Sequence, residues 1–272
     1  MIKVIIFSKD RPAQLDLTLT SIARNFQLDA SVYVLYKASN TKFEEGYDIL
    51  REYREPTDCY CMGEYDFRDD LLRLMAGPEK YTMFLTDDDI FYRKADYTEK
   101  DLDDLFSING FYCFSNRLGI NTTVQNPHNR SELAQLPKFD LIKDGDKEFL
   151  LWNWKTVGGN FGYPLSVDGH IFRTEDIISL TEKTEFKNPN FYEAHLQAHL
   201  CRIGPGMASC KNSVLFGNPV NRVQDTFTNN AGQFYGISAE DLNREFLRGK
   251  RLQFGGYGEI CGAHQEVPLS WG

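Results

Sequence analysis

The sequence has no long apolar run. Its 272 residues contain no stretch of the roughly 20 consecutive apolar residues that a membrane-spanning helix requires. The apolar run at residues 2–7 is shorter than the apolar segment of a secretory signal peptide, and Lys9, Asp10 and Arg11 follow it closely. We therefore expect no transmembrane segment and a cytoplasmic location.

Cysteines are few and mostly far apart. Of the six cysteines only Cys59 and Cys61 lie close together, and the paired Cys-x-x-Cys spacing of a zinc site is missing. Disulfides are rare in a reducing compartment. We expect free, buried thiols rather than a structural zinc site or a disulfide.

Positive charge is in deficit, with 30 Lys and Arg residues against 39 Asp and Glu and a formal net charge of −9. A chain of this sign repels nucleic acid and anionic lipid on average, so no nucleic-acid partner is expected. A phosphate-bearing ligand would need a bound cation or a local basic cluster to overcome the same repulsion.

Internal repeats and low-complexity segments are also absent. Hydrophobic residues make up 42% of the chain and aromatic residues 14%, which is enough apolar surface for a folded core. The length fits one large α/β domain or two small domains that are tightly joined.

The first third of the chain alternates β-strands and α-helices. Residues 2–7 form an Ile- and Val-rich run typical of a strand buried on both faces. Pro12 suits the first turn of the next helix, and Asp10 is a candidate N-cap. Further strands are predicted at 31–36 and 81–85, and helices at 42–54 and 67–75. This alternation predicts a parallel, doubly wound sheet.

The second half is less regular. Residues 126–148 are polar and contain Pro127 and Pro137, so we expect a long loop or flexible insertion there. The glycine-rich tail from Gly255 is expected to be irregular. Outside these segments the patterns predict strands at 111–115 and 166–173, and helices at 101–106, from 174, at 190–201 and at 238–247.

Three adjacent carboxylates, Asp87, Asp88 and Asp89, follow the predicted strand at 81–85. They repel one another, so a fold places them together mainly where they are solvated or used. Ligands bind beyond the carboxyl ends of strands in open α/β sheets. Clustered carboxylate oxygens suit hard cations such as Mg²⁺ and Mn²⁺. The alternative is a solvated turn that caps a helix.

The run Phe84-Leu85-Thr86-Asp87-Asp88-Asp89, after an N-terminal strand that leads into Ser8-Lys9-Asp10-Arg11-Pro12, resembles the GT-A glycosyltransferase superfamily. It is similar to the family-2-like and exostosin-like transferases, whose Asp-x-Asp motif matches Asp87 and Asp89. The resemblance implies a GT-A type α/β fold, with a Rossmann-like, mostly parallel central sheet flanked by helices and a less regular acceptor-binding half. It also implies Mn²⁺ or Mg²⁺ as the cofactor.

The resemblance assigns roles to the three carboxylates. Asp89 corresponds to the metal ligand that bridges the cation to the donor diphosphate, Asp87 to a ribose or metal contact, and Asp88 to either role. A divalent ion bound to both phosphates stabilises the departing nucleoside diphosphate.

Polar residues near the first strands resemble the family's nucleotide loops. Asp10 is expected to accept from the base, and Lys9 or Arg11 to meet the base or the phosphates. A capped turn and a solvated helix face are the alternatives. The expected nucleotide contacts are Ser8, Lys9, Asp10, Arg11, Lys37, Arg68, Asp87 and Asp88.

Acceptor contacts are expected from the second half. Asp168 and His170 alternate with apolar residues and share one face of their predicted strand. The resemblance makes Asp168 a candidate for binding acceptor hydroxyls or acting as base, and His170 an acceptor contact. Trp152 and Trp154 are candidates for a platform on which sugar rings stack. A polar sheet edge and core packing are the alternatives.

Glu193 opens a segment that resembles the Glu-Asp helix of inverting family-2-like enzymes, whose acid deprotonates the acceptor hydroxyl. Here Ala194 stands where that pair has Asp. We expect Glu193 and Asp168 to be the catalytic carboxylates. His264, in the tail, corresponds to the extra metal ligand of several metal-dependent members, with an ordinary loop histidine as the alternative.

Together these features predict a metal-dependent glycosyltransferase. A sugar would move from a nucleotide-diphosphate donor, with a UDP-sugar favoured, to a carbohydrate or glycan acceptor. Residues 1–95 would bind the donor and residues 96–272 the acceptor. The alternatives are a sugar nucleotidyltransferase, although the glycine-rich loop after the first strand is missing, and a non-catalytic carbohydrate-binding protein with a transferase fold.

Overall fold

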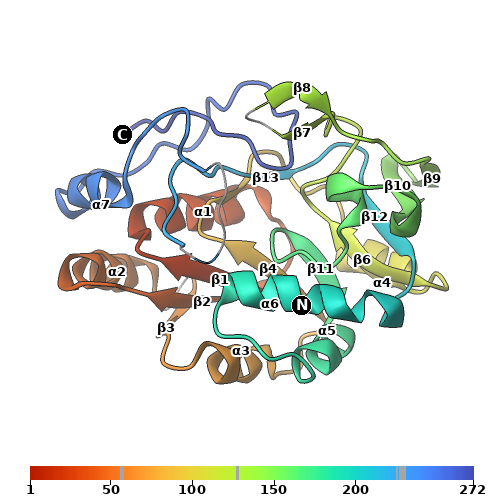
Figure 1. The fold of residues 1–272 in the computed structure, drawn as a ribbon, viewed down its shortest axis with the longest axis horizontal. Coiled ribbons are helices and arrows are strands. Elements are labelled where there is room, and N and C mark those ends of the chain that lie inside the picture. Colours follow the sequence, from red (N-terminus) through yellow and green to blue (C-terminus); the bar gives the residue numbers. More distant parts are fainter. Residues whose placement is uncertain (56–57, 127–128, 225, 227–230) are drawn as a thin grey trace.

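A nine-stranded sheet forms the centre of the protein (Figure 1). The computed structural model describes residues 1–55, 58–126, 129–224, 226 and 231–272. The sheet has the order β3-β2-β1-β4-β11-β6-β12-β10-β9, and its strands run in one direction except β11 and β10. The predicted α/β fold with a mostly parallel sheet is therefore confirmed.

The strands of the central sheet are β1 (Ile2–Lys9), β2 (Ala30–Lys37), β3 (Tyr60–Gly63), β4 (Tyr81–Thr86), β6 (Phe111–Ser115), β9 (Asp140–Asp144), β10 (Lys147–Asn153), β11 (His170–Arg173) and β12 (Gly206–Cys210). Two small sheets pair β5 (Asp89–Phe91) with β13 (Leu215–Gly217) and β7 (Val124–Asn126) with β8 (Asn129–Leu133). The helices are α1 (Pro12–Asn25), α2 (Thr41–Arg54), α3 (Phe67–Met75), α4 (Glu99–Phe106), α5 (Thr174–Thr181), α6 (Pro189–Leu196) and α7 (Ala239–Leu247). Short 3₁₀ helices are η1 (Trp154–Thr156), η2 (Gly159–Gly162) and η3 (Gln197–Arg202).

Strand β1 is buried on both faces, as its continuous apolar run predicts. Ile2, Val4 and Ile6 pack in one core cluster together with side chains of α1, α2 and α7. Ile5 and Phe7 point the other way and pack with side chains of α3, α5 and α6. The period of two along a strand thus joins the two layers of helices to the same sheet.

The expected loop over residues 126–148 is wrong. These residues include β8, β9 and the start of β10, and β10 pairs with both β9 and β12. Apolar Phe149 and Trp152 are buried, whereas β9 is mostly exposed at the edge of the sheet. An edge strand with one solvated face carries polar residues, and for that reason its sequence resembles a loop.

The predicted N-cap at Asp10 is also wrong. The N-cap of α1 is Arg11, which forms no side-chain capping bond. Asp10 has φ 57°, its backbone N–H donates to the Lys37 carbonyl, and its carboxylate accepts from the Ser39 N–H at 2.7 Å. Asp10 therefore ties the loop after β1 to the loop after β2.

Two further elements have boundaries that differ from the predicted ones. The strand expected at 166–173 begins only at His170, and the helix expected at 190–201 ends at Leu196 and continues as η3. Helix α7 begins after Ser238, whose hydroxyl accepts from the Asp241 N–H as expected. In the described part of the chain, none of the helices combines the length and the apolar character needed to span a bilayer.

His170 predicts a specific acid sensitivity. Its side chain is fully buried on β11, and burial together with the nearby Arg117 charge lowers the pKa of His170 from 6.5 to about 3. At pH values between these two pKa values, His170 is protonated in the unfolded state but neutral in the folded state. Stability is therefore present above pH 6.5 and is lost as the pH falls.

We expect His170→Gln to remove about 2 kcal/mol of the fall in unfolding free energy between pH 7 and pH 5. Urea denaturation at the two pH values measures this fall. His195→Gln, at an exposed position on α6, serves as the control and should leave it unchanged. An equal fall in wild type and His170→Gln would contradict the assignment.

Candidate functional site

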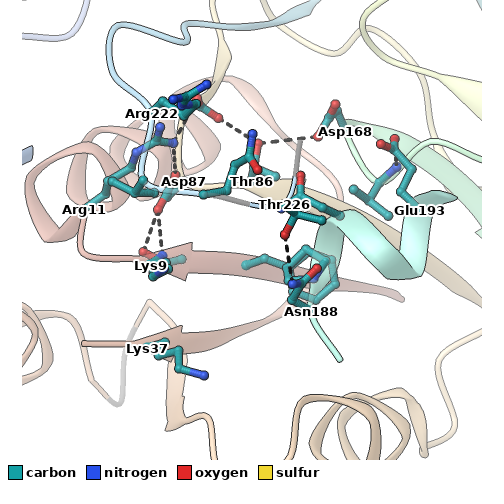
Figure 2. A pocket seen from close by; sticks show the side chains of 18 of the residues that line it. Lys9, Arg11, Lys37, Thr86, Asp87, Asp168, Asn188, Glu193, Arg222 and Thr226 are labelled. Atoms are coloured by element: carbon teal, nitrogen blue, oxygen red, sulfur yellow. Dashed lines mark hydrogen bonds and ion pairs between the residues drawn. The ribbon is translucent and has the colours of Figure 1, made fainter. Parts of the chain in front are cut away.

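A cavity of about 810 Å³ opens at the carboxyl ends of β1, β2 and β4 (Figure 2). The segment before α6, the segment around residues 219–224 and the C-terminal tail form its other walls. Parallel strands bring their carboxyl ends to one edge of the sheet, where ligands of α/β proteins bind. The expected site residues that line it are Ser8, Lys9, Arg11, Lys37, Asp87, Asp88, Asp168, Glu193 and His264.

Asp87 holds the loop after β1 in place. One carboxylate oxygen accepts from Arg11 Nη1 at 2.9 Å, and the other accepts from Ser8 Oγ at 2.9 Å and from the Lys9 N–H at 3.1 Å. Burial raises the pKa of Asp87 to about 6; the Arg11 guanidinium opposes this shift and the Asp88 charge adds to it. Both oxygens are occupied, so these contacts do not favour the expected metal-ligand role.

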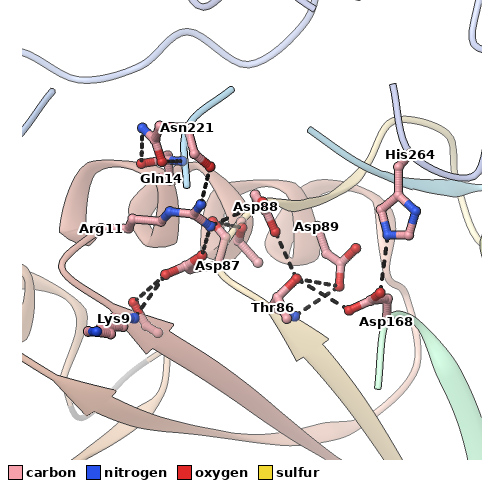
Figure 3. A network of polar contacts seen from close by, with 12 residues as sticks. Lys9, Arg11, Gln14, Thr86, Asp87, Asp88, Asp89, Asp168, Asn221 and His264 are labelled. Atoms are coloured by element: carbon pink, nitrogen blue, oxygen red, sulfur yellow. Dashed lines mark hydrogen bonds and ion pairs between the residues drawn. The ribbon is translucent and has the colours of Figure 1, made fainter. Parts of the chain in front are cut away.

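Arg11, expected to meet the base or the phosphates, lines the cavity and also forms structural contacts. Its side chain is buried, and Nη1 also lies 3.1 Å from an oxygen of Asp88. Its Nη2 donates to the Asn221 carbonyl. Gln14 and Asn221 are also joined through their side chains, so Arg11 ties the Asp cluster to the wall around residue 221 (Figure 3).

The other two aspartates differ sharply in environment. Asp88 lines the cavity and accepts from Thr86 Oγ1 at 2.8 Å. Asp89 is fully buried beneath it, and its Oδ2 accepts from the Thr86 N–H at 2.9 Å. The Oδ1 atom of Asp89 has no hydrogen-bond partner among the described residues. Burial raises the pKa of Asp89 well above its usual range, and the charges of Asp168 and Asp88 raise it further.

Asp168 faces Asp89 from the loop before β11 (Figure 3). Its Oδ2 lies 3.1 Å from His264 Nε2 and 3.3 Å from Arg117 Nη1. Burial raises the pKa of Asp168, but the His264 hydrogen bond and the Arg117 charge outweigh burial and lower it to about 2. Asp168 is therefore a permanent anion beside the crowded Asp89.

The backbone fixes the position of His264. Gly217, the last residue of β13, forms a parallel bridge with His264, and a Cβ atom at Gly217 would lie 2.5 Å from His264 Cδ2. Strand β13 pairs with β5, which begins at Asp89. The small β5–β13 sheet therefore brings the tail to the Asp cluster, and the missing side chain of Gly217 leaves room for the imidazole.

The chemistry of Asp89, Asp168 and His264 fits a divalent cation. The orphaned buried oxygen of Asp89 and the crowding of two carboxylates are the features that a cation would relieve. In the residues that the structure describes, no group of three or more His, Cys, Asp or Glu side chains is already arranged around a metal position. A cation would thus require these side chains to move.

Glu193 lies on α6 at the opposite wall from Lys9 (Figure 2). Its Oε1 accepts from Ser166 Oγ at 2.8 Å and from the Val167 N–H at 3.1 Å, and its Oε2 has no partner within the described residues. Burial and the Asp168 charge raise the pKa of Glu193. Glu193 is therefore a stronger proton acceptor than an ordinary carboxylate.

Besides Arg11, four basic side chains line the walls of the cavity, namely Lys9, Lys37, Lys187 and Arg222. Lys37 pairs with Glu64 at 2.7 Å. Lys9, Lys187 and Arg222 form no ion pair within the described part of the chain. Near Lys187, Asn188 caps α6 and donates to Thr226 Oγ1 at 3.1 Å. Free cations of this kind suit phosphate oxygens.

Besides Asp10 in the loop after β1 and the buried Asp89, four predicted contacts do not line the cavity. Arg68 donates to the carbonyls of Glu182 and Thr184, so it joins α3 to the segment after α5. The buried indoles of Trp152 and Trp154 donate to backbone carbonyls and expose no face to a sugar. His170 is fully buried. The expected phosphate contact of Arg68 is corrected to a contact between α3 and the segment after α5, which its two carbonyl hydrogen bonds hold in place. The expected stacking platform and acceptor contact are corrected to core positions, because the rings of Trp152, Trp154 and His170 are buried.

Sequence reasoning missed Arg117, Lys187 and Arg222. Arg117 follows β6 in a segment without a recognisable motif, and it is nevertheless buried beside Asp168 and Ser166. Lys187 and Arg222 lie in irregular segments. The nearest sequence signal was the Asn188-Pro189 start of α6, which marks a helix N-terminus but indicates no ligand.

One curated protein and several solved structures are similar to the chain. The bifunctional glycosyltransferase pgtA of Dictyostelium discoideum is 25% identical over 287 residues, which cover 92% of this chain and 36% of that protein. The chain thus spans about a third of the length of this relative. No protein-family model matches the chain.

Among solved structures, S. aureus TarS 1-349 in complex with UDP has a TM-score of 0.49 and 12% identity, covering 80% of this chain and 61% of that one. A cytidylyltransferase from Leptospira borgpetersenii has a TM-score of 0.42 and 10% identity, covering 91% and 94%. The curated relative agrees with the resemblance to glycosyltransferases that the sequence gives.

The Arg11–Asp87 pair predicts a large loss of stability when it is broken. Arg11→Met leaves the Asp87 carboxylate buried without its partner and should lower the unfolding free energy by about 3 kcal/mol. Adding Asp87→Asn removes the uncompensated charge and should restore part of that loss. Urea denaturation of both variants measures the difference. A double variant less stable than Arg11→Met would show that the pair does not act as described.

Proposed function

We propose that the protein is a metal-dependent glycosyltransferase that uses a nucleoside-diphosphate sugar, with a UDP-sugar favoured, and a glycan acceptor. The observation that carries the proposal is the pairing, in one cavity, of two kinds of carboxylate. Asp168, with Asp89 behind it, is suited to a cation, and Glu193 is suited to a proton. The similarity to a glycosyltransferase of Dictyostelium supports the same reaction class.

The donor would lie along the ends of β1 and β2. Leu35 and Phe67 supply apolar surface for a nucleoside base, and Lys37 and Glu64 supply polar groups at its edge. Lys9 lines the same cavity, and its backbone N–H donates to Asp87, so its ammonium group would be available to a diphosphate bound beside Asp87. Residues 1–95 would thus bind the donor, and the remainder of the chain would complete the acceptor side.

Asp89, Asp168 and His264 would hold Mn²⁺ or Mg²⁺. When bound, such an ion neutralises charge on the departing diphosphate. Thr86 supports the cluster because its hydroxyl donates to Asp88 and its backbone N–H donates to Asp89. Lys9, Lys187 and Arg222 add positive charge along the walls.

Glu193 would be the general base. Its free Oε2 would accept the proton of the acceptor hydroxyl. At the same time the hydroxyl oxygen of the acceptor would attack the anomeric carbon of the donor sugar, and the sugar–phosphate bond would break. The opposite pKa shifts of Glu193 and Asp168 separate the two carboxylates into a proton acceptor and a permanent anion. Asp168, with a pKa of about 2, is too weak a base for the first role.

A sugar nucleotidyltransferase is the second candidate, because a cytidylyltransferase is among the similar solved structures. The two activities leave different products. A nucleotidyltransferase joins a nucleoside triphosphate to a sugar phosphate and releases pyrophosphate. A glycosyltransferase releases a nucleoside diphosphate. Phosphorus NMR of the product mixture separates them.

Thermal unfolding tests the donor site directly. The wild-type protein is unfolded with UDP, GDP, CMP or dTDP, each with and without Mn²⁺. One of these nucleotides should raise the stability of the protein when Mn²⁺ is present. At a hundredfold excess over the Kd this stabilisation is about 2.7 kcal/mol. Asp89→Asn should abolish the Mn²⁺-dependent part, whereas Asp104→Asn, on the exposed face of α4, should keep it. No shift with any nucleotide and Mn²⁺ would overturn the proposal.

Glu193→Gln tests the base. An amide keeps the shape and accepts from Ser166, but it accepts no proton, so kcat should fall by about 10²–10³-fold with little change in the donor KM. The assay measures release of the nucleoside diphosphate with an acceptor present. Glu240→Gln, at an exposed position on α7, is the matched control. A kcat within a factor of two of wild type would remove Glu193 from this role.

A further inference from the structure

One buried guanidinium links the two carboxylates of the proposed mechanism. Arg117 lies just beyond the end of β6, and only 2% of it is exposed. Its Nη1 lies 3.3 Å from Asp168 Oδ2, and its Nη2 lies 2.9 Å from Ser166 Oγ. Ser166 Oγ in turn lies 2.8 Å from Glu193 Oε1. A single side chain thus reaches both Asp168 and, through one hydroxyl, Glu193.

The direction of these hydrogen bonds is fixed by chemistry. A guanidinium only donates, so the Ser166 oxygen accepts from Arg117. The Asp168 backbone N–H also donates to this oxygen, at 3.3 Å. With its oxygen accepting twice, Ser166 has one hydrogen left, and this hydrogen goes to Oε1 of Glu193. The Val167 N–H donates to the same Oε1, at 3.1 Å.

The consequence is a difference between the two oxygens of Glu193. Oε1 accepts two hydrogen bonds from the loop before β11, and Oε2 accepts none from the described residues. Rotation of the carboxylate would cost both bonds and leave the Ser166 hydroxyl without its acceptor. Oε2 is therefore the oxygen presented to a ligand in the cavity.

We propose that Arg117 is a positioning residue that acts through Ser166 to present Oε2 of Glu193 to the acceptor hydroxyl, while it holds Asp168 on the cation side. The inference rests on the proposed transferase function. It assigns a role to a side chain that touches neither donor nor acceptor. It also explains why a guanidinium is buried at this point, since one planar group with two separate nitrogens meets Asp168 and Ser166 at once.

A double-mutant cycle tests the chain from Arg117 to Ser166. Ser166→Ala alone should lower kcat about tenfold, and Arg117→Met alone about a hundredfold, with the donor KM changed less than about threefold. In the Arg117→Met background, Ser166→Ala should cost less than about twofold, because the hydroxyl is no longer oriented. Ser209→Ala, a buried serine of β12 outside the cavity, is the control and should leave kcat unchanged in both backgrounds.

Circular dichroism and the Tm establish that each variant is folded. If Arg117→Met does not fold, Arg117→Lys carries the same comparison, since one ammonium nitrogen cannot serve both Asp168 and Ser166. If Ser166→Ala lowers kcat by the same factor in the wild-type and Arg117→Met backgrounds, the inference is overturned, whereas the proposed transferase function still stands. If the wild type shows no transferase activity and Glu193→Gln is indistinguishable from it, the proposed function is wrong, and the inference fails with it.

Discussion

The constraint on which the site depends is the repulsion among carboxylates at the end of β4. Asp87, Asp88 and Asp89 follow one another there, and Asp168 faces them from the loop before β11. Two buried arginines offset this repulsion from opposite sides. Arg11 neutralises Asp87 and Asp88, and Arg117 neutralises Asp168. Asp89 contacts neither guanidinium, so it is the carboxylate at which further positive charge would be most favourable.

The order of the strands explains why these groups meet. Strand β4 lies between β1 and β11, so the loops after β1 and before β11 flank the aspartates directly. Strand β5, which begins at Asp89, recruits β13, and β13 brings the tail with His264. Residues far apart in the chain therefore share one cavity because of sheet topology rather than local sequence.

The two arginines also divide the site into regions with different chemistry. Near Arg117 and His264, Asp168 stays ionised across the physiological range. On α6, burial raises the pKa of Glu193. The hydroxyl of Ser166 donates to Oε1 of Glu193, so Oε2 of the same carboxylate stays free. Carboxylates of the same chemical type are thus suited to different tasks by their surroundings, which is a common way for one site to combine charge stabilisation with proton transfer.

Local pattern was sufficient for the elements whose sequence and burial agree. The apolar runs of β1 and β4, the cap at Ser238 and the carboxylates at the end of β4 were all predictable, because strand burial and helix capping depend on neighbouring residues. Edge strand β9 was missed because its polar sequence is the same as that of a loop.

The pairing of charges was decided only by the tertiary structure. Asp87 accepts from Arg11 rather than facing the cavity freely, Trp152 is in the core, and Arg117 lies beside Asp168, 51 positions away along the chain. A sequence states which charged groups exist, but burial and distance set their energies, and both arise only when the sheet assembles.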